Sequence, residues 1–113
     1  MEVTVSTHNT HTEIRVTGIV GKIWEADEII TALENQWRAH PDTTIRLIFD
    51  NTFTIPSRLI GALLNMIREH GIRLEVVPLE WLLYQLLERL NLLELLNVTF
   101  RPNRQRGTVA TGS

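Results

Sequence analysis

A strand, a helix and a second strand follow one another between residues 44 and 77, and this unit constrains the fold most. Four of the six residues in 44–49 are apolar, which is typical of a strand covered on both faces. Residues 56–70 then carry apolar side chains at helical spacing, and Gly71 suits the left-handed position that ends a helix. A second apolar stretch, 72–77, follows. Two such strands joined by a helix predict a parallel crossover.

The rest of the chain extends this unit into an α/β domain. Alternating residues on both sides of a polar turn predict an N-terminal hairpin, and two further stretches show helical spacing. Residues 98–100 are either a last strand or packed coil. This order predicts one domain over residues 1–100, with a mixed sheet of four to five strands and helices mainly on one face. The expected strands are 2–6, 13–17, 44–49 and 72–77, and the expected helices are 24–40, 56–70 and 79–90.

The composition suits one compact core, since the chain has 113 residues and is 43% hydrophobic. It contains no run of about eighteen apolar residues, so we expect no membrane insertion. The N-terminus lacks a basic region followed by an apolar stretch, which argues against a secretory signal. The absence of cysteine excludes disulfides and thiolate metal sites, and it is compatible with the cytoplasmic location that we expect.

The charge is unevenly distributed along the chain. Residues 1–100 hold eight basic and thirteen acidic residues, whereas residues 101–113 hold three arginines and no acid. The last thirteen residues also have little apolar content, so we expect a disordered basic tail. Elsewhere the basic residues are dispersed and no aromatic stripe accompanies them, which argues against nucleic-acid binding.

The segment 49–64 carries the most specific motif. Asp50 closes the apolar strand, Ser57 opens the following helix, and that helix contains Gly61 followed by Ala-Leu-Leu. This segment resembles the signature of STAS domains, the fold of bacterial anti-sigma-factor antagonists and of sulfate-transporter tails. The order of strands and helices also resembles that family. In the family a partner kinase phosphorylates the helix-opening serine, so the resemblance implies phosphorylation of Ser57.

The resemblance further implies a non-enzymatic regulator without a cofactor. Its partner would be an anti-sigma-type serine kinase docking around Asp50, Asn51, Thr54, Ser57 and Arg58, and a PP2C-type phosphatase would reset the switch. Physical chemistry is compatible with this role, because a phosphate at a helix N-terminus meets free N–H groups and the positive end of the dipole. Arg58 could also pair with the phosphate.

Two alternatives stay open at this motif. Ser57 could serve only the start of the helix, which is a common role for serine. The protein could also be a non-switching STAS-like scaffold, a subunit of a transporter or of a multi-protein sensing complex. Pro56, Arg58 and Leu59 favour the scaffold, because they stand where typical family members have Asp, Ser and Gly.

The third expected helix carries an aromatic pair, Trp81 and Tyr84, away from its leucine stripe. Exposed tryptophan and tyrosine are favoured interface anchors, so this pair predicts contact with a partner or with a second copy of the chain. The alternative is that both rings fold back over neighbouring loops. The stripe expected in the core is Leu79, Leu82, Leu83, Leu86 and Leu90 in this helix, and Ile60, Leu63, Leu64 and Ile67 in the preceding one.

Neither metal binding nor catalysis is predicted. His8 and His11 have H-x-x-H spacing, but they lie in an expected turn with no cysteine, third histidine or nearby acid. We therefore expect solvated turn histidines and no metal. Ser57 is not part of a Gly-x-Ser-x-Gly turn and has no evident histidine base, so we expect that the protein is not an enzyme.

Overall fold

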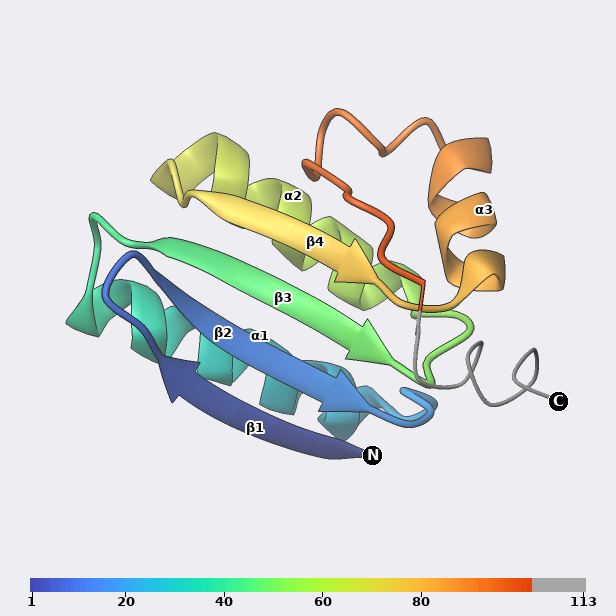
Figure 1. The fold of residues 1–113 in the computed structure, drawn as a ribbon, viewed down its shortest axis with the longest axis horizontal. Helices are drawn as coiled ribbons and strands as arrows, with labels where there is room; N and C mark the ends of the chain where they lie inside the picture. The colour runs from blue at the N-terminus through green and yellow to red at the C-terminus, as the bar shows by residue number, and fades with distance from the viewer. Residues whose placement is uncertain (103–113) are drawn as a thin grey trace, which may run out of the picture.

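Seven elements follow one another in the predicted order in a computed structural model that describes residues 1–102. The strands form one mixed sheet in the order β1-β2-β3-β4, in which β1 pairs antiparallel with β2 and the other neighbours are parallel (Figure 1). This confirms the predicted α/β class. The strands are β1 (Glu2–Thr7), β2 (His11–Thr17), β3 (Thr44–Asp50) and β4 (Leu74–Pro78), and the helices are α1 (Ile23–Ala39), α2 (Ser57–His70) and α3 (Trp81–Arg89).

The C-terminal segment 97–101 runs alongside β4 as a short parallel neighbour. The Val76 N–H donates to the Asn97 carbonyl at 3.2 Å, and the Thr99 N–H donates to the Val76 carbonyl at 2.9 Å. The Arg101 N–H then donates to the Pro78 carbonyl at 3.1 Å. The segment expected to be strand or coil is thus attached to the sheet, and so is the first residue of the expected tail. Residues 103–113 of that tail lie outside the described residues.

Helices α1 and α2 cover one face of the sheet, and α3 stands beside the end of β4 (Figure 1). The covered face holds the core. In β2, for example, burial alternates so that Thr12, Ile14 and Val16 are buried while their neighbours are not, as expected for a strand with one covered face. The other face is polar towards the amino ends of the strands, where Arg46 on β3 lies in register between Glu13 on β2 and Glu75 on β4. Farther along the same face, Ile48 and Val77 are buried.

The predicted core stripe of α2 is wrong by one row. Leu59, Leu63 and Met66 are the buried residues of this helix, whereas three of the four predicted positions, Ile60, Leu64 and Ile67, are only partly buried at the edge of the core. The two rows lie next to each other on a helix, since both have spacings of three and four. The apolar pattern alone therefore did not distinguish which row faces the sheet.

Helix α3 is shorter than predicted and buries fewer leucines. The Leu79 N–H donates to the Phe49 carbonyl at 3.0 Å, so this residue is still bonded to β3 and the helix begins two residues later. Leu82 and Leu90, which were expected in the core, are exposed. Only Leu83 and Leu87 of α3 are buried, because Leu92 and Leu96 of the following segment also enter the core.

No helix among residues 1–102 is both long and apolar enough to cross a membrane.

Candidate functional site

The carboxyl ends of β2, β3 and β4 meet at one edge of the sheet, because these three strands are parallel. Their arrowheads point to the right in Figure 1, where α1, α2 and α3 begin. In open α/β sheets this edge is where ligands usually bind. The edge also carries Ser57, the first residue of α2.

Hydrogen bonds join the two loops that lead to α1 and α2. The Gly18 N–H donates to the Asp50 carbonyl at 3.0 Å, and the hydroxyl of the buried Thr52 donates to the Gly18 carbonyl at 2.7 Å. Gly18 has a φ of 103° and Asn51 a φ of 54°, which are values that glycine and asparagine adopt at the lowest cost. The loop before Ser57 is therefore held in place by the loop after β2.

The predicted docking residues occupy this edge, but their side chains differ in availability. Asp50 is engaged by Arg15 of the neighbouring strand, with Nη1 and Oδ2 2.9 Å apart. Asn51 and Thr54 are exposed on the loop. Asp50 thus supports the edge of the sheet, whereas Asn51 and Thr54 face solvent beside Ser57.

Ser57 is exposed and does not cap the helix. The N-cap position belongs to Pro56, and no side chain caps this helix start. The first helical hydrogen bonds run from the N–H groups of Leu59 and Ile60 to the Pro56 carbonyl, at 3.0 and 3.2 Å. The amides that precede Leu59 are therefore left over at the helix start, as at every helix N-terminus. Ser57 therefore does not have the capping role that the sequence left open.

Arg58 links the start of α2 to α1. Its Nη2 and Nε atoms both lie 2.8 Å from Oδ1 of Asp27. Exposed ion pairs of this kind contribute about 0–1 kcal/mol to stability. Arg58 can consequently exchange Asp27 for another anion at small cost.

Large apolar side chains are exposed on the two loops that the Gly18 contacts join and at the start of α1, and we call them the apolar rim: Ile19, Ile23, Trp24 and Phe53. They are 68%, 71%, 61% and 41% exposed. Ile19 belongs to the connection from β2 into α1, Ile23 and Trp24 are the first two residues of α1, and Phe53 belongs to the connection from β3 into α2. Exposed apolar groups gathered in one place mark protein interaction sites more often than single ones do. Sequence reasoning missed the rim, although Trp24 lies off the row of residues that α1 buries, Ala26, Ile29 and Leu33.

The predicted aromatic pair forms a ring cluster at the start of α3. The Trp81 and Tyr84 rings are stacked with centroids 5.2 Å apart, and each lies 5.3 Å from the ring of Phe100. Trp81 remains 52% exposed, while Tyr84 is partly buried. The two rings therefore fold over the C-terminal segment, as the alternative expected, while Trp81 keeps an exposed aromatic surface. Contact with a partner or a second copy stays a prediction.

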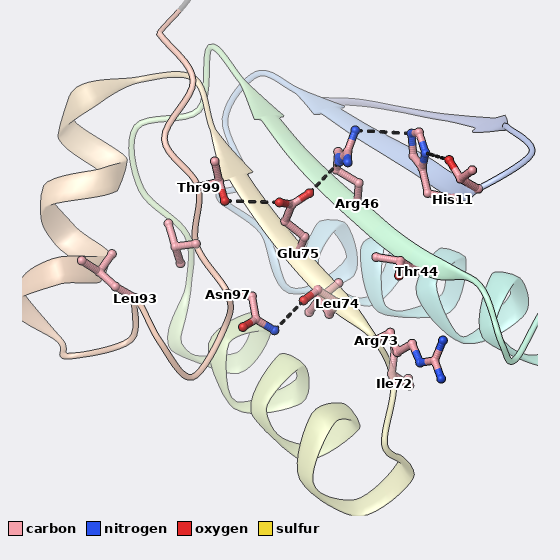
Figure 2. Close-up of a pocket in the computed structure, with 12 residues that line it drawn as sticks. His11, Thr44, Arg46, Ile72, Arg73, Leu74, Glu75, Leu93, Asn97 and Thr99 are labelled. Atoms are coloured by element: carbon pink, nitrogen blue, oxygen red, sulfur yellow. Dashed lines mark hydrogen bonds and ion pairs between the residues drawn. The ribbon is translucent and has the colours of Figure 1, made fainter.

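A broad open groove of about 950 Å³ lies along the amino-terminal halves of β3 and β4 (Figure 2). Its polar side chains bind one another: Arg46 Nε lies 2.6 Å from Oε1 of Glu75, and the Thr99 hydroxyl donates to the other oxygen of that carboxylate at 3.2 Å. The Asn97 amide donates to the Leu74 carbonyl at 3.0 Å. These groups attach the C-terminal segment to β4.

The expectation that no acid lies near the turn histidines is wrong. Glu13 on β2 places its two carboxylate oxygens 3.8 Å from His8 Nε2 and 4.0 Å from His11 Nε2. His11 and Glu13 are two residues apart in a strand and so share a face, which the sequence would have indicated had β2 been expected to begin at His11.

No family model matches the chain, and no curated protein matches it either. The resemblance to STAS domains therefore rests on the motif in residues 49–64 and on the order of the elements.

Proposed function

We propose that the protein is a non-enzymatic regulator that binds a protein partner at the carboxyl edge of its sheet and is switched by phosphorylation of Ser57. The partner proposed from the motif is an anti-sigma-type serine kinase, and a PP2C-type phosphatase would reverse the modification. The observation that carries the proposal is the exposed, non-capping Ser57 on the same sheet edge as the apolar rim. Because a serine kinase needs ATP, we expect the protein to act in the cytoplasm.

The apolar rim would supply most of the binding free energy. Interfaces depend on a few large side chains that are buried in the complex, with tryptophan among the most frequent. Trp24 and Ile23 are more than half exposed in the free protein, so a partner can remove them from water without rearranging the fold. Lys22 lies 4.7 Å from the centroid of the Trp24 ring, which limits the motion of that side chain.

Phosphorylation would act through electrostatics at the start of α2. The kinase would transfer the γ-phosphoryl group of ATP to the Ser57 hydroxyl oxygen, and the phosphatase would hydrolyse the resulting ester. The phosphate adds a charge of about −1.5 to −2 beside free helix amides, where the fold tolerates it. A partner that covers the rim would have to desolvate this dianion, which is costly. We therefore expect the phosphorylated form to release the partner.

Arg58 would connect the modification to the shape of the surface. A phosphate on the neighbouring residue competes with Asp27 for the guanidinium, and a bidentate arginine–phosphate pair is stronger than an exposed carboxylate pair. Loss of the contact between Arg58 and Asp27 would remove one of the contacts at the start of α1, which carries Trp24. Phosphorylation would thus change the charge beside the rim and one contact that links α1 to α2.

A crosslinking experiment in the protein's own cells tests this proposal. A photo-reactive amino acid at position 53 is expected to crosslink to the partner in the Ser57→Ala background and to lose that crosslink in the Ser57→Asp background. Position 95 is the matched control, because Leu95 is also exposed but lies between α3 and the C-terminal segment 97–101. Equal crosslinking at position 53 in both backgrounds would contradict the proposal.

The second candidate function is the non-switching scaffold. The ring cluster of Trp81, Tyr84 and Phe100 favours it, since Trp81 and the next residue, Leu82, are both exposed. A scaffold of this kind would keep its partner, or a second copy of the chain, in both Ser57 backgrounds and lose it in Trp81→Ala.

A further inference from the structure

The turn between β1 and β2 brings three metal-ligand side chains together. The rings of His8 and His11 are stacked, with centroids 4.7 Å apart and planes inclined by 18°. The carboxylate of Glu13 faces both rings, and one ligand atom from each residue lies within 4.8 Å of the other two. Two imidazoles and one carboxylate are the donor set of many open zinc sites.

The backbone fixes this arrangement. The hairpin ladder ends at the pair Thr7 and Thr12, and the His8 N–H donates to the His11 carbonyl at 2.9 Å to close the turn. Along β2, His11 and Glu13 project from the face that α1 and α2 leave uncovered. The turn then folds His8 back over these two residues, so the three side chains converge without any helix contributing.

We propose that His8, His11 and Glu13 bind a divalent transition-metal ion of the zinc type. Zinc lies about 2.0–2.2 Å from nitrogen and oxygen ligands, which places two ligands of a tetrahedral ion about 3.4 Å apart. The distances of 3.8 and 4.0 Å from Glu13 to the two imidazoles exceed this value by about half an ångström. Small rotations of the exposed His8 and the partly exposed Glu13 side chains close that gap. A fourth position stays open to water or to an external ligand.

Two neighbours of His11 tune the site. Its Nδ1 lies 3.1 Å from the Thr10 hydroxyl, an outer contact of the kind that orients metal-binding imidazoles. Arg46 Nη1 lies 3.4 Å from the Nε2 atom, and Figure 2 shows this guanidinium between His11 and Glu75. Metal binding requires Arg46 to release His11, while the 2.6 Å contact with Glu75 can persist. The arginine charge therefore opposes the metal and limits its affinity.

The site is separate from the proposed switch. The turn precedes β2, whereas Ser57 lies at the edge where β2 ends. A metal ion here would hold the end of the hairpin together and stabilise the edge strand β1. Its binding would not depend on phosphorylation of Ser57.

Titration of the metal-stripped, untagged protein with zinc chloride in a calorimeter tests the proposal. We expect one zinc ion per chain, at least tenfold weaker binding in His11→Ala and in Glu13→Gln, and no binding of magnesium, which prefers oxygen ligands. His40→Ala and His70→Ala are the matched controls and should bind zinc as the unaltered chain does. Arg46→Gln should bind about tenfold more tightly, from the repulsion expected across about 6 Å in a water-like dielectric.

NMR spectra of the unaltered protein test the same site without any variant, so the test also works if a variant does not fold. In the unaltered protein, zinc should shift the imidazole proton signals of His8 and His11 and leave those of His40 and His70 in place. Zinc binding that is equally tight in a folded His8→Ala/His11→Ala variant would overturn the proposal. So would the absence of any shift at His8 and His11 at millimolar zinc.

Discussion

Two buried threonines should respond in opposite directions to the same substitution. Thr12 and Thr52 are 1% and 0% exposed. Among the described residues, the Thr12 hydroxyl is a buried polar group without a hydrogen-bond partner, whereas the Thr52 hydroxyl donates to the Gly18 carbonyl and lies 3.1 Å from the Asp50 carbonyl. Valine replaces the hydroxyl with a methyl group of similar shape, so Thr→Val isolates the effect of the hydroxyl at each position.

The expected changes follow from the desolvation of each hydroxyl. At Thr12 the folded state holds a desolvated hydroxyl with no compensating bond, so Thr12→Val should raise the free energy of unfolding by about 1 kcal/mol. At Thr52 the substitution removes a buried hydrogen bond and leaves the Gly18 carbonyl without this donor, which should lower that free energy by about 1–3 kcal/mol. The two variants should therefore differ by about 2–4 kcal/mol.

Urea unfolding, followed by circular dichroism and by tryptophan fluorescence, measures both changes. The m-value should stay constant, and the midpoint should move up for Thr12→Val and down for Thr52→Val. Serine variants are the controls: Thr52→Ser keeps the hydroxyl and should lose less stability than Thr52→Val, whereas Thr12→Ser should be less stable than the unaltered chain. A destabilising Thr12→Val or a neutral Thr52→Val would refute the reasoning.

The other predictions concern two glycines and the apolar rim. Gly61→Ala should stabilise the protein by up to about 1 kcal/mol, because the added methyl group meets nothing within 4 Å in α2. Gly71→Ala should destabilise it by about 1–2 kcal/mol, because this residue has a φ of 64°. Thermal unfolding should show a higher midpoint for the first variant and a lower one for the second. Ile23→Ser and Trp24→Ser should change the free energy of unfolding by less than about 0.5 kcal/mol but weaken partner binding at least tenfold. Leu95→Ser is the control and should leave binding unchanged. Equal binding by all three variants would exclude the rim as the binding surface.

The sequence predicted the elements whose signal is local. The β3–α2–β4 unit follows from a continuous apolar strand, a helical stripe and Gly71, which indeed adopts the left-handed conformation at the end of α2. The face of a helix that meets the sheet is set by tertiary packing, so the pattern placed α2 one row away from the buried Leu59 and Met66. For the same reason α3 was predicted too long, since Leu79 is still bonded to Phe49 of β3.

The candidate site was predicted only in part. Ser57 and the loop before it could be located from the motif, because the carboxyl end of a parallel strand and the start of the next helix are adjacent in sequence. The apolar rim combines residues from two regions that are more than 25 residues apart in sequence and that are joined by the contacts of Gly18 with Asp50 and Thr52. The convergence of Glu13 on the turn histidines likewise depends on where the hairpin turn closes.

The phosphorylation state of Ser57 in protein isolated from its own cells tests the central claim most directly. Intact-mass measurement, with fragmentation that separates Ser57 from Thr52 and Thr54, should find phosphate on Ser57 in a fraction of molecules that changes with growth conditions. Ser57 that stays unmodified under every condition, in cells where position 53 still crosslinks to a partner, would contradict the switch.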